Sequence, residues 1–424
     1  MAPLGPFEDR PRLAVAVSGG ADSLSLALLA DAWARQRGGS MLALVVDHGL
    51  RAESAAEARL TLGRLAGRGI PGRLLTLSGL MHGPALAERA RAARHAVLEA
   101  ACAEAGIVHL LYGHHACDQA ETVAMRLLAH SGPAGLAGMA ALSESATVRR
   151  LRPLLAVPPL RLRATLRAAG MEWVEDPSNR DPATLRARLR ALRRDPDGTG
   201  PATEAAVRAA AARGNARAAA ERGAAELLAR GARLYPEGFA VLGPGLLPTA
   251  PLAALLRVLA GAEWPPSEKQ LARLAEAPAA ATIGGVRILP AGRLQPGGWL
   301  LVREEAAMAA GVPAVPGAVW DGRFRLCTDA VLPEGARLEA LGAESARLRR
   351  HSHWPAAVLR ALPAVRVQGS LFAVPHIGYA GEDRGERVRI SFTCRMPASG
   401  AGFLAGGVGA SQTGARAELG RADP

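Results

Sequence analysis

Short apolar runs alternate with longer amphipathic segments along the first third of the chain. Runs of strand length occupy residues 14–17, 41–46, 73–77 and 107–112, and apolar residues at helical spacing occupy 24–30, 53–68, 84–105 and 123–129. Strands that alternate with helices of this length form a parallel sheet with helices on both faces. The pattern predicts an α/β fold with a parallel, doubly wound sheet for this part of the chain.

The rest of the chain has a different pattern. Residues 188–233 are rich in Ala and Arg at helical spacing, with a break near 195–201. Helices are expected in 248–277 and 338–362, and short strands in 282–289, 299–303, 323–327 and 366–377. We therefore expect an α/β domain at 1–190, a basic helical connector at 191–235, smaller α+β domains at 236–315 and 316–395, and a Gly/Ala-rich disordered tail at 396–424.

A glycine turn separates the first strand from the first helix, in the order Ser18, Gly19, Gly20, Ala21, Asp22, Ser23. The free N–H groups of a helix start and the positive end of its dipole favour an anion there, and glycine lets the backbone approach a phosphate. A carboxylate at Asp22 would repel a phosphate unless a cation lay between them. The stretch predicts a phosphate site with a metal nearby; the alternative is an ordinary turn with a serine N-cap.

Two more polar clusters follow predicted strands, at 47–51 and 114–122. Ligands of open α/β sheets bind at the carboxyl ends of the strands, so all three clusters fall where a ligand is expected. Taken singly, each has a structural explanation: Asp47 and His48 can cap a helix, and Asp118 and Glu121 can compensate a helix dipole. A metal that bridges Asp22 and Asp118 would also explain the carboxylates.

Charge and composition narrow the class of partner. The formal net charge is +13 and is carried almost wholly by arginine. Arginine binds phosphate bidentately and stacks on bases, so a nucleic-acid partner is expected. A coding bias would explain Arg in place of Lys but not the excess of positive charge. Lys269 is the single lysine and lies outside any glycine loop, which argues against Walker-type NTPases, lysine Schiff-base enzymes and lysyl-adenylate ligases.

Cysteine usage and hydropathy point to a cytoplasmic protein. The four cysteines form no Cys-x-x-Cys pair, so no zinc or iron–sulfur signature and no disulfide framework is expected. The N-terminus does not read as a signal peptide, and no apolar run approaches the length that spans a membrane.

The stretch Ser18–Ser23 resembles the pyrophosphate loop of the N-type ATP pyrophosphatases, which have an adenine-nucleotide-hydrolase-like fold. Further stretches, in order, are similar to motifs of the tRNA(Ile)-lysidine synthase family within that group. They are residues 46–51, 114–122, 131–136, 152–155 and 175–181, followed by Arg186 and Arg190. The resemblance covers about residues 12–190.

The resemblance implies that ATP adenylates the C2 oxygen of the wobble cytidine in tRNA(Ile) with a CAU anticodon, and that free L-lysine then displaces AMP. It implies ATP and Mg²⁺ as cofactors and no membrane partner, and a homodimer among the possible assemblies, because the family often works as a dimer. The implied catalytic residues are Asp22, His48, His115 and Asp118, with Mg²⁺ on Asp22 and Asp118. ATP contacts are implied for Ser18, Gly19, Gly20, Ala21, Asp22, Ser23, Asp47 and His48. Three carboxylates are open as the site of the lysine ammonium: Glu121, Asp176 and Asp181. The candidate contacts with RNA phosphates are Arg94, Arg152, Arg180, Arg186 and Arg190, and Asn179 also belongs to the lysine or tRNA group.

Two departures from the family pattern leave alternatives open. Cys117 stands where the family commonly has a second acidic residue, and Ala187 where it has asparagine. If the site needs both carboxylates, metal affinity falls; since a thiol is a poor ligand for Mg²⁺, we interpret Cys117 as a small helix-start residue. The rival functions are another enzyme of this fold, such as a tRNA thiolase or an amidating synthetase, and a nucleotide- and RNA-binding protein that has lost catalysis. Paired cysteines, which such thiolases use, are missing.

Overall fold

A computed structural model describes residues 1–47, 49, 53–77, 86–145, 147–175, 184–245, 247–328, 332–381, 388–394, 397–398 and 403–406. The chain divides into two compact units. Unit 1 comprises Met1–Ala219 and the segment from Phe403 onward, and unit 2 comprises Ala220–Gly402. None of the described helices is both long and apolar enough to cross a lipid bilayer.

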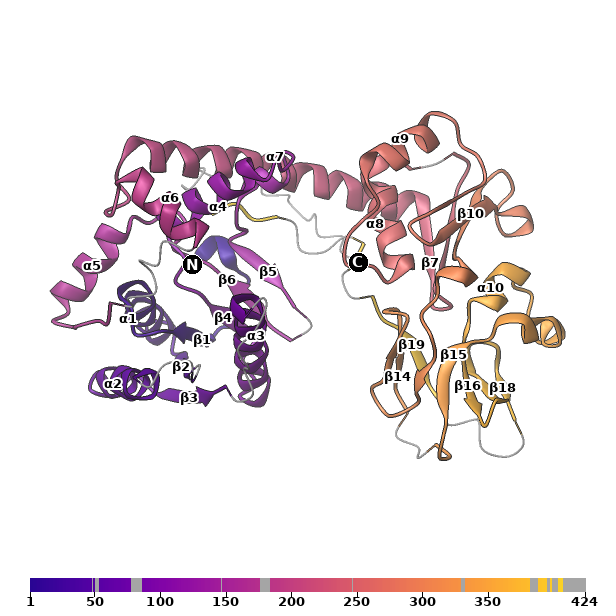
Figure 1. Cartoon of the computed structure of the whole chain (residues 1–424), viewed down its shortest axis with the longest axis horizontal. Helices are drawn as coiled ribbons and strands as arrows, with labels where there is room; N and C mark the ends of the chain where they lie inside the picture. The colour runs from indigo at the N-terminus through magenta and orange to yellow at the C-terminus, as the bar shows by residue number, and fades with distance from the viewer. Residues whose placement is uncertain are drawn as a thin grey trace, which may run out of the picture. The chain divides into compact units, whose positions relative to one another are not determined.

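Unit 1 contains the predicted alternation of strands and helices (Figure 1). Its strands are β1 (Arg12–Val17), β2 (Ser40–Asp47), β3 (Gly72–Thr76), β4 (His109–Leu111), β5 (Leu142–Glu144) and β6 (Arg149–Leu151). Its helices are α1 (Ala21–Arg35), α2 (Ser54–Ala66), α3 (Leu86–Glu104), α4 (Ala116–Leu128), α5 (Pro159–Ala168) and α6 (Leu185–Arg193). The long helix α7 (Pro201–Gly231) follows, and the division between the units falls within it.

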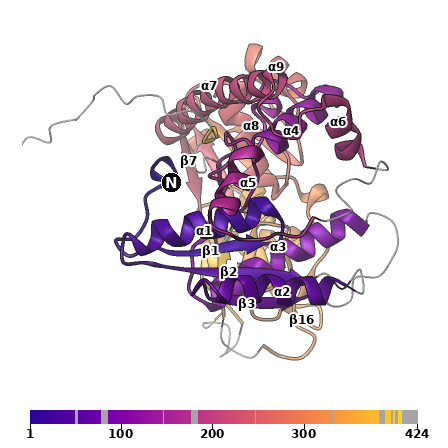
Figure 2. The same cartoon turned by 90° about the vertical axis from the view of Figure 1, so that its left-hand side faces the viewer.

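The sheet of unit 1 has the strand order β3-β2-β1-β4-β6-β5. Strands β1, β2 and β3 lie side by side and pair in parallel (Figure 2). Strand β4 pairs in parallel with both β1 and β6, and only the edge strand β5 runs antiparallel. The predicted parallel α/β sheet is confirmed, with one antiparallel hairpin added at its edge.

Alternate residues of β1 enter two separate apolar cores. Leu13, Val15 and Val17 pack in a core that also contains buried residues of α1, α2 and α5. Ala14 and Ala16 pack in a second core with Leu98 and Ala101 of α3. Because successive side chains of a strand point to opposite faces, a strand covered by helices on both faces is apolar at every position. This explains the uninterrupted apolar run at residues 13–17.

Unit 2 is built mainly from antiparallel strands. The first sheet, in the order β7-β8-β11-β10-β9, contains β7 (Ala232–Tyr235), β8 (Phe239–Leu242), β9 (Ala281–Ile283), β10 (Val286–Pro290) and β11 (Trp299–Arg303). The second, in the order β12-β15-β16-β17-β18, contains β12 (Val312–Pro313), β15 (Arg337–Ala340), β16 (Pro363–Val367), β17 (Ser370–Val374) and β18 (Tyr379–Ala380). The third contains β13 (Val319–Trp320), β14 (Phe324–Leu326) and β19 (Ile390–Phe392).

Three α-helices accompany these sheets: α8 (Thr249–Ala260), α9 (Glu268–Glu276) and α10 (Ala356–Arg360). Short 3₁₀ turns complete the described elements of the chain: Ala2–Leu4, Gly135–Ala137, Gly292–Leu294, Glu305–Ala307, Gly342–Ala346, Arg349–His351 and Pro375–Ile377. The mixture of antiparallel sheets and helices agrees with the α+β class expected after the connector.

One predicted helix is wrong. Residues 338–362 begin in strand β15, continue through two 3₁₀ turns and end in the short helix α10. Gly342 adopts a positive φ of 61°, which side chains other than glycine resist. Leu341, Leu348 and Leu359 of this stretch come from separate elements and pack in one small core. Spacing alone cannot distinguish these cases.

The predicted disordered tail is also wrong at the four residues after Gly402 that are described. Phe403 is buried, and Ala405 forms an isolated antiparallel bridge with Ala140 of unit 1. Residues 407–424 lie outside the described residues. The predicted domain boundaries at 190, 235, 315 and 395 stay predictions.

Candidate active site

The glycine turn leads from β1 directly into α1. Gly20 is the N-cap of the helix, and Gly19 adopts a positive φ of 83°. The Ser23 hydroxyl accepts the N–H of Ser18 at 3.1 Å and donates to the carbonyl of Gly20 at 3.1 Å. Ser23 therefore fixes the turn from inside, while the first N–H groups of α1 lack intrahelical acceptors. The result is a loop held by hydrogen bonds at a helix start, where free N–H groups suit a phosphate.

Strand β4 ends against this loop. At Gly113 a Cβ would lie 3.1 Å from the backbone nitrogen of Ser23, a tight contact that glycine avoids. The next two residues are His114 and His115, and α4 begins at Ala116. The parallel order of β1 and β4 thus brings the starts of α1 and α4 together, although about ninety residues separate them in the sequence.

His115 connects the two helix starts. Its Nδ1 accepts the N–H of Cys117 at 3.2 Å, which makes it the N-cap of α4. Its Nε2 lies 3.4 Å from a carboxylate oxygen of Asp22 and 3.4 Å from one of Asp118. Nε2 is therefore the ring nitrogen that faces both carboxylates, while Nδ1 faces the start of α4. Two of the predicted catalytic carboxylates therefore converge on one predicted catalytic histidine.

Burial and neighbouring charges shift the pKa values of His115 and Asp118 in opposite directions. Burial lowers the pKa of His115, but its hydrogen bonds and the negative charges of Asp118 and Asp22 raise it to about 10. Burial raises the pKa of Asp118, but His115, His114 and the backbone N–H of His115 lower it below its ordinary value. Asp118 is therefore an anion at neutral pH.

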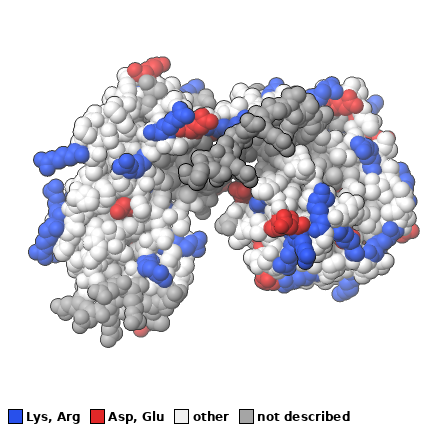
Figure 3. Space-filling model, turned by 180° about the vertical axis from the view of Figure 1, so that it is seen from behind, with Lys and Arg blue, Asp and Glu red and all other residues white. Residues whose placement is uncertain are grey.

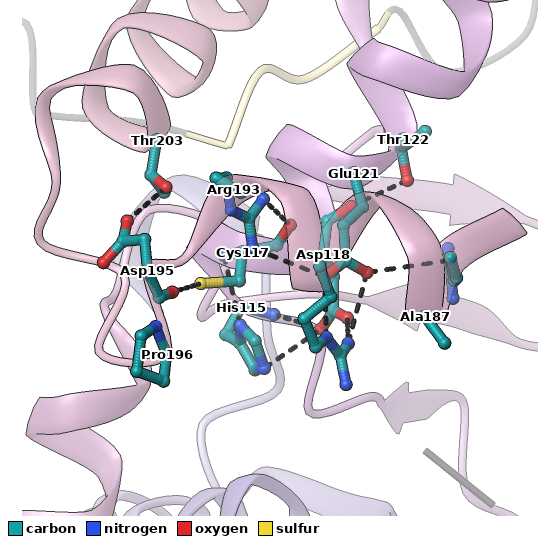
Figure 4. A network of polar contacts seen from close by, with 12 residues as sticks. His115, Cys117, Asp118, Glu121, Thr122, Ala187, Arg193, Asp195, Pro196 and Thr203 are labelled. Carbon is teal, nitrogen blue, oxygen red and sulfur yellow. Dashed lines mark hydrogen bonds and ion pairs between the residues drawn. The ribbon is translucent and has the colours of Figure 1, made fainter. Parts of the chain in front are cut away.

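Glu121 lies one helical turn further along α4 and is fully buried (Figure 4). Its carboxylate accepts from Arg190 at 2.9 and 3.2 Å and from Arg193 at 3.4 Å, and Arg186 lies at 4.0 Å. Arg190 also lies 3.7 Å from Asp118. Helix α6 therefore covers the carboxylates of α4 with cations, and two predicted site arginines meet two predicted site carboxylates.

Arg193 was not among the predicted site residues. It donates to the backbone carbonyl of Cys117 at 3.2 Å as well as to Glu121. Its signal was present in the sequence, because Arg186, Arg190 and Arg193 have the i, i+4, i+7 spacing that places three residues on one helix face.

Cys117 faces away from the carboxylates. Its thiol lies 3.8 Å from the carbonyl of Asp195 in the turn between α6 and α7 (Figure 4). The Asp195 carboxylate in turn accepts the hydroxyl of Thr203 at 2.5 Å and the N–H of Gly200 at 3.0 Å. This contact favours the interpretation of Cys117 as a helix-start residue over that of a metal ligand.

A cationic corner lies beside the site, where β4 and β6 end. Arg152 lies over the ring of Tyr112 at 5.9 Å, and the Tyr112 hydroxyl bonds to Nδ1 of His95 at 2.8 Å. Burial lowers the pKa of His95 to about 4, and nearby arginines act in the same direction. Burial also lowers the pKa of His114 to about 4, where the charge of Asp118 opposes the shift and nearby arginines add to it. Buried nitrogens of Arg94, His114 and Arg152 have no hydrogen-bond partner among the described residues. An anion would satisfy this corner.

The other predicted site residues divide into two groups. Asp47 accepts the N–H of Gly49 at 2.9 Å and the hydroxyl of Ser54 at 2.5 Å, so it braces the turn that leads to α2. A contact of Asp47 with ATP stays a prediction. Five predicted residues lie outside the described residues: His48, Asp176, Asn179, Arg180 and Asp181.

The donors near Asp22 suit a hard cation. Among the described residues, no three His, Cys, Asp or Glu side chains group closely enough to hold a metal by themselves. Mg²⁺ does not need such a cage, because it is commonly held by one or two carboxylates together with waters and substrate phosphates. Asp22 is partly exposed and lies at the mouth of the glycine loop, so the pair Asp22 and Asp118 fits that mode.

Comparisons with known proteins agree with this geometry. A family model described as a PP-loop domain matches residues 2–193. A tRNA(Ile)-lysidine synthase of Ruegeria pomeroyi is 35% identical over 87% of this chain and 89% of its own length. The chain belongs to the tRNA(Ile)-lysidine synthase family.

Another tRNA(Ile)-lysidine synthase, from a Bradyrhizobium species, is 44% identical over 54% of this chain, and the chain spans 63% of that relative's length. A solved structure, the U34-tRNA thiolase NcsA from Methanococcus maripaludis with its 4Fe-4S cluster, matches 49% of this chain and 75% of that chain, with 19% identity and a TM-score of 0.41.

Proposed function

We propose that this protein ligates lysine to C2 of the wobble cytidine of tRNA(Ile) with a CAU anticodon. In the first step the C2 oxygen attacks the α-phosphate of ATP and pyrophosphate leaves. In the second step the amine of free lysine attacks C2, loses a proton and displaces AMP. Family membership supports the reaction class, and the observation that carries the proposal is the convergence of Asp22, His115 and Asp118 beside the glycine loop.

The loop Ser18–Ser23 would bind the β- and γ-phosphates. Negative charge grows on the departing pyrophosphate, and rigid N–H donors stabilise it without reorganising. The hydrogen bonds of Ser23 hold the donors in place before ATP arrives. The loop therefore favours the transition state over free ATP.

Asp22 and Asp118 would hold Mg²⁺ against the phosphates. Bound there, the metal would neutralise charge on the phosphates as a Lewis acid. His115 keeps both carboxylates in position through Nε2 while its other nitrogen is fixed by the helix cap. We infer that His115 orients the carboxylates and does not itself move a proton.

Glu121 would recognise the side-chain ammonium of lysine. Its carboxylate is buried, and in this structure Arg190 and Arg193 pair with it. The lysine ammonium can replace one guanidinium at this carboxylate, and Arg190 is the more exposed of the two. Lysine binding would therefore release Arg190 toward the RNA.

Arginines would hold the RNA. Arg94 and Arg152 lie in the cationic corner, and their guanidinium groups would attract a phosphate of the RNA backbone. Basic side chains outnumber acidic ones on the face drawn in Figure 3, in keeping with the net charge of +13. Unit 2 would add contacts to the tRNA that are sensitive to salt.

The proposal is tested by pyrophosphate release from ATP in the presence of Mg²⁺, lysine and tRNA. We expect release with tRNA(Ile) bearing CAU and none with an initiator tRNA that has the same anticodon. Release without RNA would indicate a small-molecule synthetase. Binding of tRNA without release would indicate that catalysis has been lost and would overturn the proposal.

Substitution of Glu121 tests the lysine site. Glu121→Gln removes the charge but keeps the shape, so the KM for lysine is expected to rise by about ten- to a hundredfold, the range for loss of a hydrogen bond to a charged group. The KM for ATP should stay within about twofold. Glu172→Gln is the control, because Glu172 pairs with Arg64 at the surface of the same unit. An unchanged KM for lysine would place lysine elsewhere.

Substitution of His115 separates its two roles. Asparagine is a good N-cap, so His115→Asn should keep the cap of α4, whereas His115→Ala should lose about 1 kcal/mol of stability. Both remove the Nε2 contact with Asp22 and Asp118 and should slow turnover by about ten- to a hundredfold, as other residues that orient metal ligands do. Thermal unfolding and pyrophosphate release measure the two effects. Full turnover of His115→Asn would show that the carboxylates need no such support.

A further inference from the structure

The segment Phe403–Gly406 lies in unit 1, although the residues immediately before it belong to unit 2. We name it the return segment. Ala405 forms an antiparallel bridge with Ala140, and the N–H of Ala141 donates to the carbonyl of Leu404 at 2.8 Å. The return segment thus adds a short backbone pairing just before β5 begins.

A socket in unit 1 receives the ring of Phe403. The ring is 7% exposed and packs against Ala137 and Ala218, and the guanidinium of Arg217 lies 4.6 Å from its centroid. At Gly214 of α7 a Cβ would come within 2.7 Å of the ring, so glycine leaves the room that the ring fills. A buried aromatic ring with a cation on its face makes a specific packing contact, which differs from non-specific collapse of a chain end.

A second close fit anchors the other end of the return segment. A Cβ at Gly406 would lie 2.5 Å from Cβ of Leu155, which is fully buried in the main core of unit 1. Leu404 packs against the same core. Both ends of the return segment are therefore held by shape as well as by hydrogen bonds.

The backbone that the return segment pairs with also holds Arg152. The carbonyl of Ala140 accepts from the Arg152 guanidinium at 2.9 Å, and the carbonyl of Ala141 accepts the Arg152 N–H at 2.8 Å. The same guanidinium lies over Tyr112 and lines the cationic corner beside His114. A chain of direct contacts thus runs from Phe403 through Ala140 and Ala141 to Arg152.

We propose that Phe403 and the return segment are positioning elements that fix the Arg152 guanidinium for contact with the tRNA. The proposal rests on the proposed function, because the RNA contact of Arg152 belongs to it. The return segment touches no residue of the glycine loop in any described contact, so binding of ATP is independent of it. Its loss misplaces one cation in the RNA site and leaves the ATP site intact.

Three changes to the full chain test this. Phe403→Ala empties the socket, and Phe403→Leu fills most of it again. Gly214→Val places a side chain of α7 in the space that the Phe403 ring occupies. Two truncations provide a matched pair: removal of residues 403–424 deletes the return segment, and removal of 407–424 keeps it. Hydrogen exchange at the amides of Ala141 and Arg152 reports the pairing, and steady-state kinetics report KM for tRNA and for ATP separately.

We expect Phe403→Ala, Gly214→Val and the longer truncation to speed exchange at both amides by about tenfold or more. The same variants should raise the KM for tRNA by about tenfold, the effect of misplacing one charge-assisted contact. The KM for ATP should not change in any of these variants. Phe403→Leu and the shorter truncation should have exchange rates and a KM for tRNA close to those of the wild type. Faster exchange without a change in the KM for tRNA would show that the return segment stabilises the backbone but does not affect tRNA binding, and this would overturn the proposal.

The outcomes also separate this proposal from the proposed function. If the wild type releases no pyrophosphate with any tRNA, the proposed function fails. Exchange at Ala141 and Arg152 then still decides whether the return segment holds Arg152. Unchanged exchange in Phe403→Ala would refute the positioning itself, whatever the reaction.

Discussion

Asp22→Asn is expected to lower the kcat for pyrophosphate release by about 10²–10³-fold, the cost of removing one group that stabilises charge in a transition state. Asparagine has nearly the shape of aspartate, so the turn and α1 should keep their structure. What it loses is the negative charge beside the glycine loop and the partner of His115 Nε2. The Mg²⁺ concentration needed for half-maximal rate should rise as well, because one hard ligand is replaced by a weaker one.

Asp31→Asn is the matched control for this experiment. Asp31 lies on the same helix but pairs with Arg35 one turn away, at 2.7 Å. Loss of such a helical pair costs about 0.3–0.5 kcal/mol of stability and should leave the kinetics unchanged. If Asp22→Asn turned over at the wild-type rate with an unchanged demand for Mg²⁺, Asp22 would have no role in catalysis.

Asp321→Ala is expected to destabilise unit 2 by about 3–5 kcal/mol, the range for breaking a buried ion pair by removal of one partner. The Asp321 carboxylate is 2% exposed and accepts from Arg323 at 2.7 Å, from Arg303 at 3.0 and 3.1 Å, and from the N–H of Ala309 at 2.9 Å. Arg323 is fully buried, and burial lowers its pKa to about 10 against the opposing charge of Asp321. Removal of the carboxylate leaves the guanidinium groups of Arg303 and Arg323 buried without the negative charge that now neutralises them.

Hydrogen exchange of amides in β13 and β14 measures the effect within unit 2. Glu305→Ala is the control, because Glu305 pairs with Arg360 at the surface and such pairs are worth about 0–1 kcal/mol. Burial raises the pKa of Asp321, but its bonds to Arg303 and the charge of Arg323 lower it below its ordinary value. The stabilisation is therefore complete above a pH of about 4 and is lost as the pH falls through the folded-state pKa. Equal stability of wild type and variant at neutral pH would show that the triad contributes nothing.

Local sequence patterns predicted the fold of unit 1 because each segment there adopts the secondary structure that its own pattern of apolar residues favours. The run at residues 13–17 reads as a buried strand since both faces of β1 are covered by helices. Unit 2 was harder to predict. Its strands are short and depend on partners distant in the chain, as β14 does on β19, so periodicity around Leu341 and Leu348 was mistaken for a helix.

The position of the candidate site could also be predicted from the sequence, but its detailed contacts could not. Glycine and acidic residues after consecutive strands indicated one edge of a parallel sheet, and Asp22, His115 and Asp118 do meet there. The sequence could not show that His115 caps α4 through one nitrogen and faces two carboxylates through the other. Nor could it show that Arg190 and Arg193 neutralise Glu121, because ion pairs across about seventy residues depend on how α6 packs on α4.

The sequence by itself determined the order of strands and helices in unit 1, the glycine turn at the start of α1 and the types of residue available near it. These features depend on contacts within a few residues of one another, and propensity and periodicity record such contacts. Only the tertiary structure decided which charges pair, which way Cys117 faces, and that Phe403 returns to the unit that contains the glycine loop. Those outcomes depend on packing between segments far apart in the chain, where the free energy of burial, and not local preference, selects the partner.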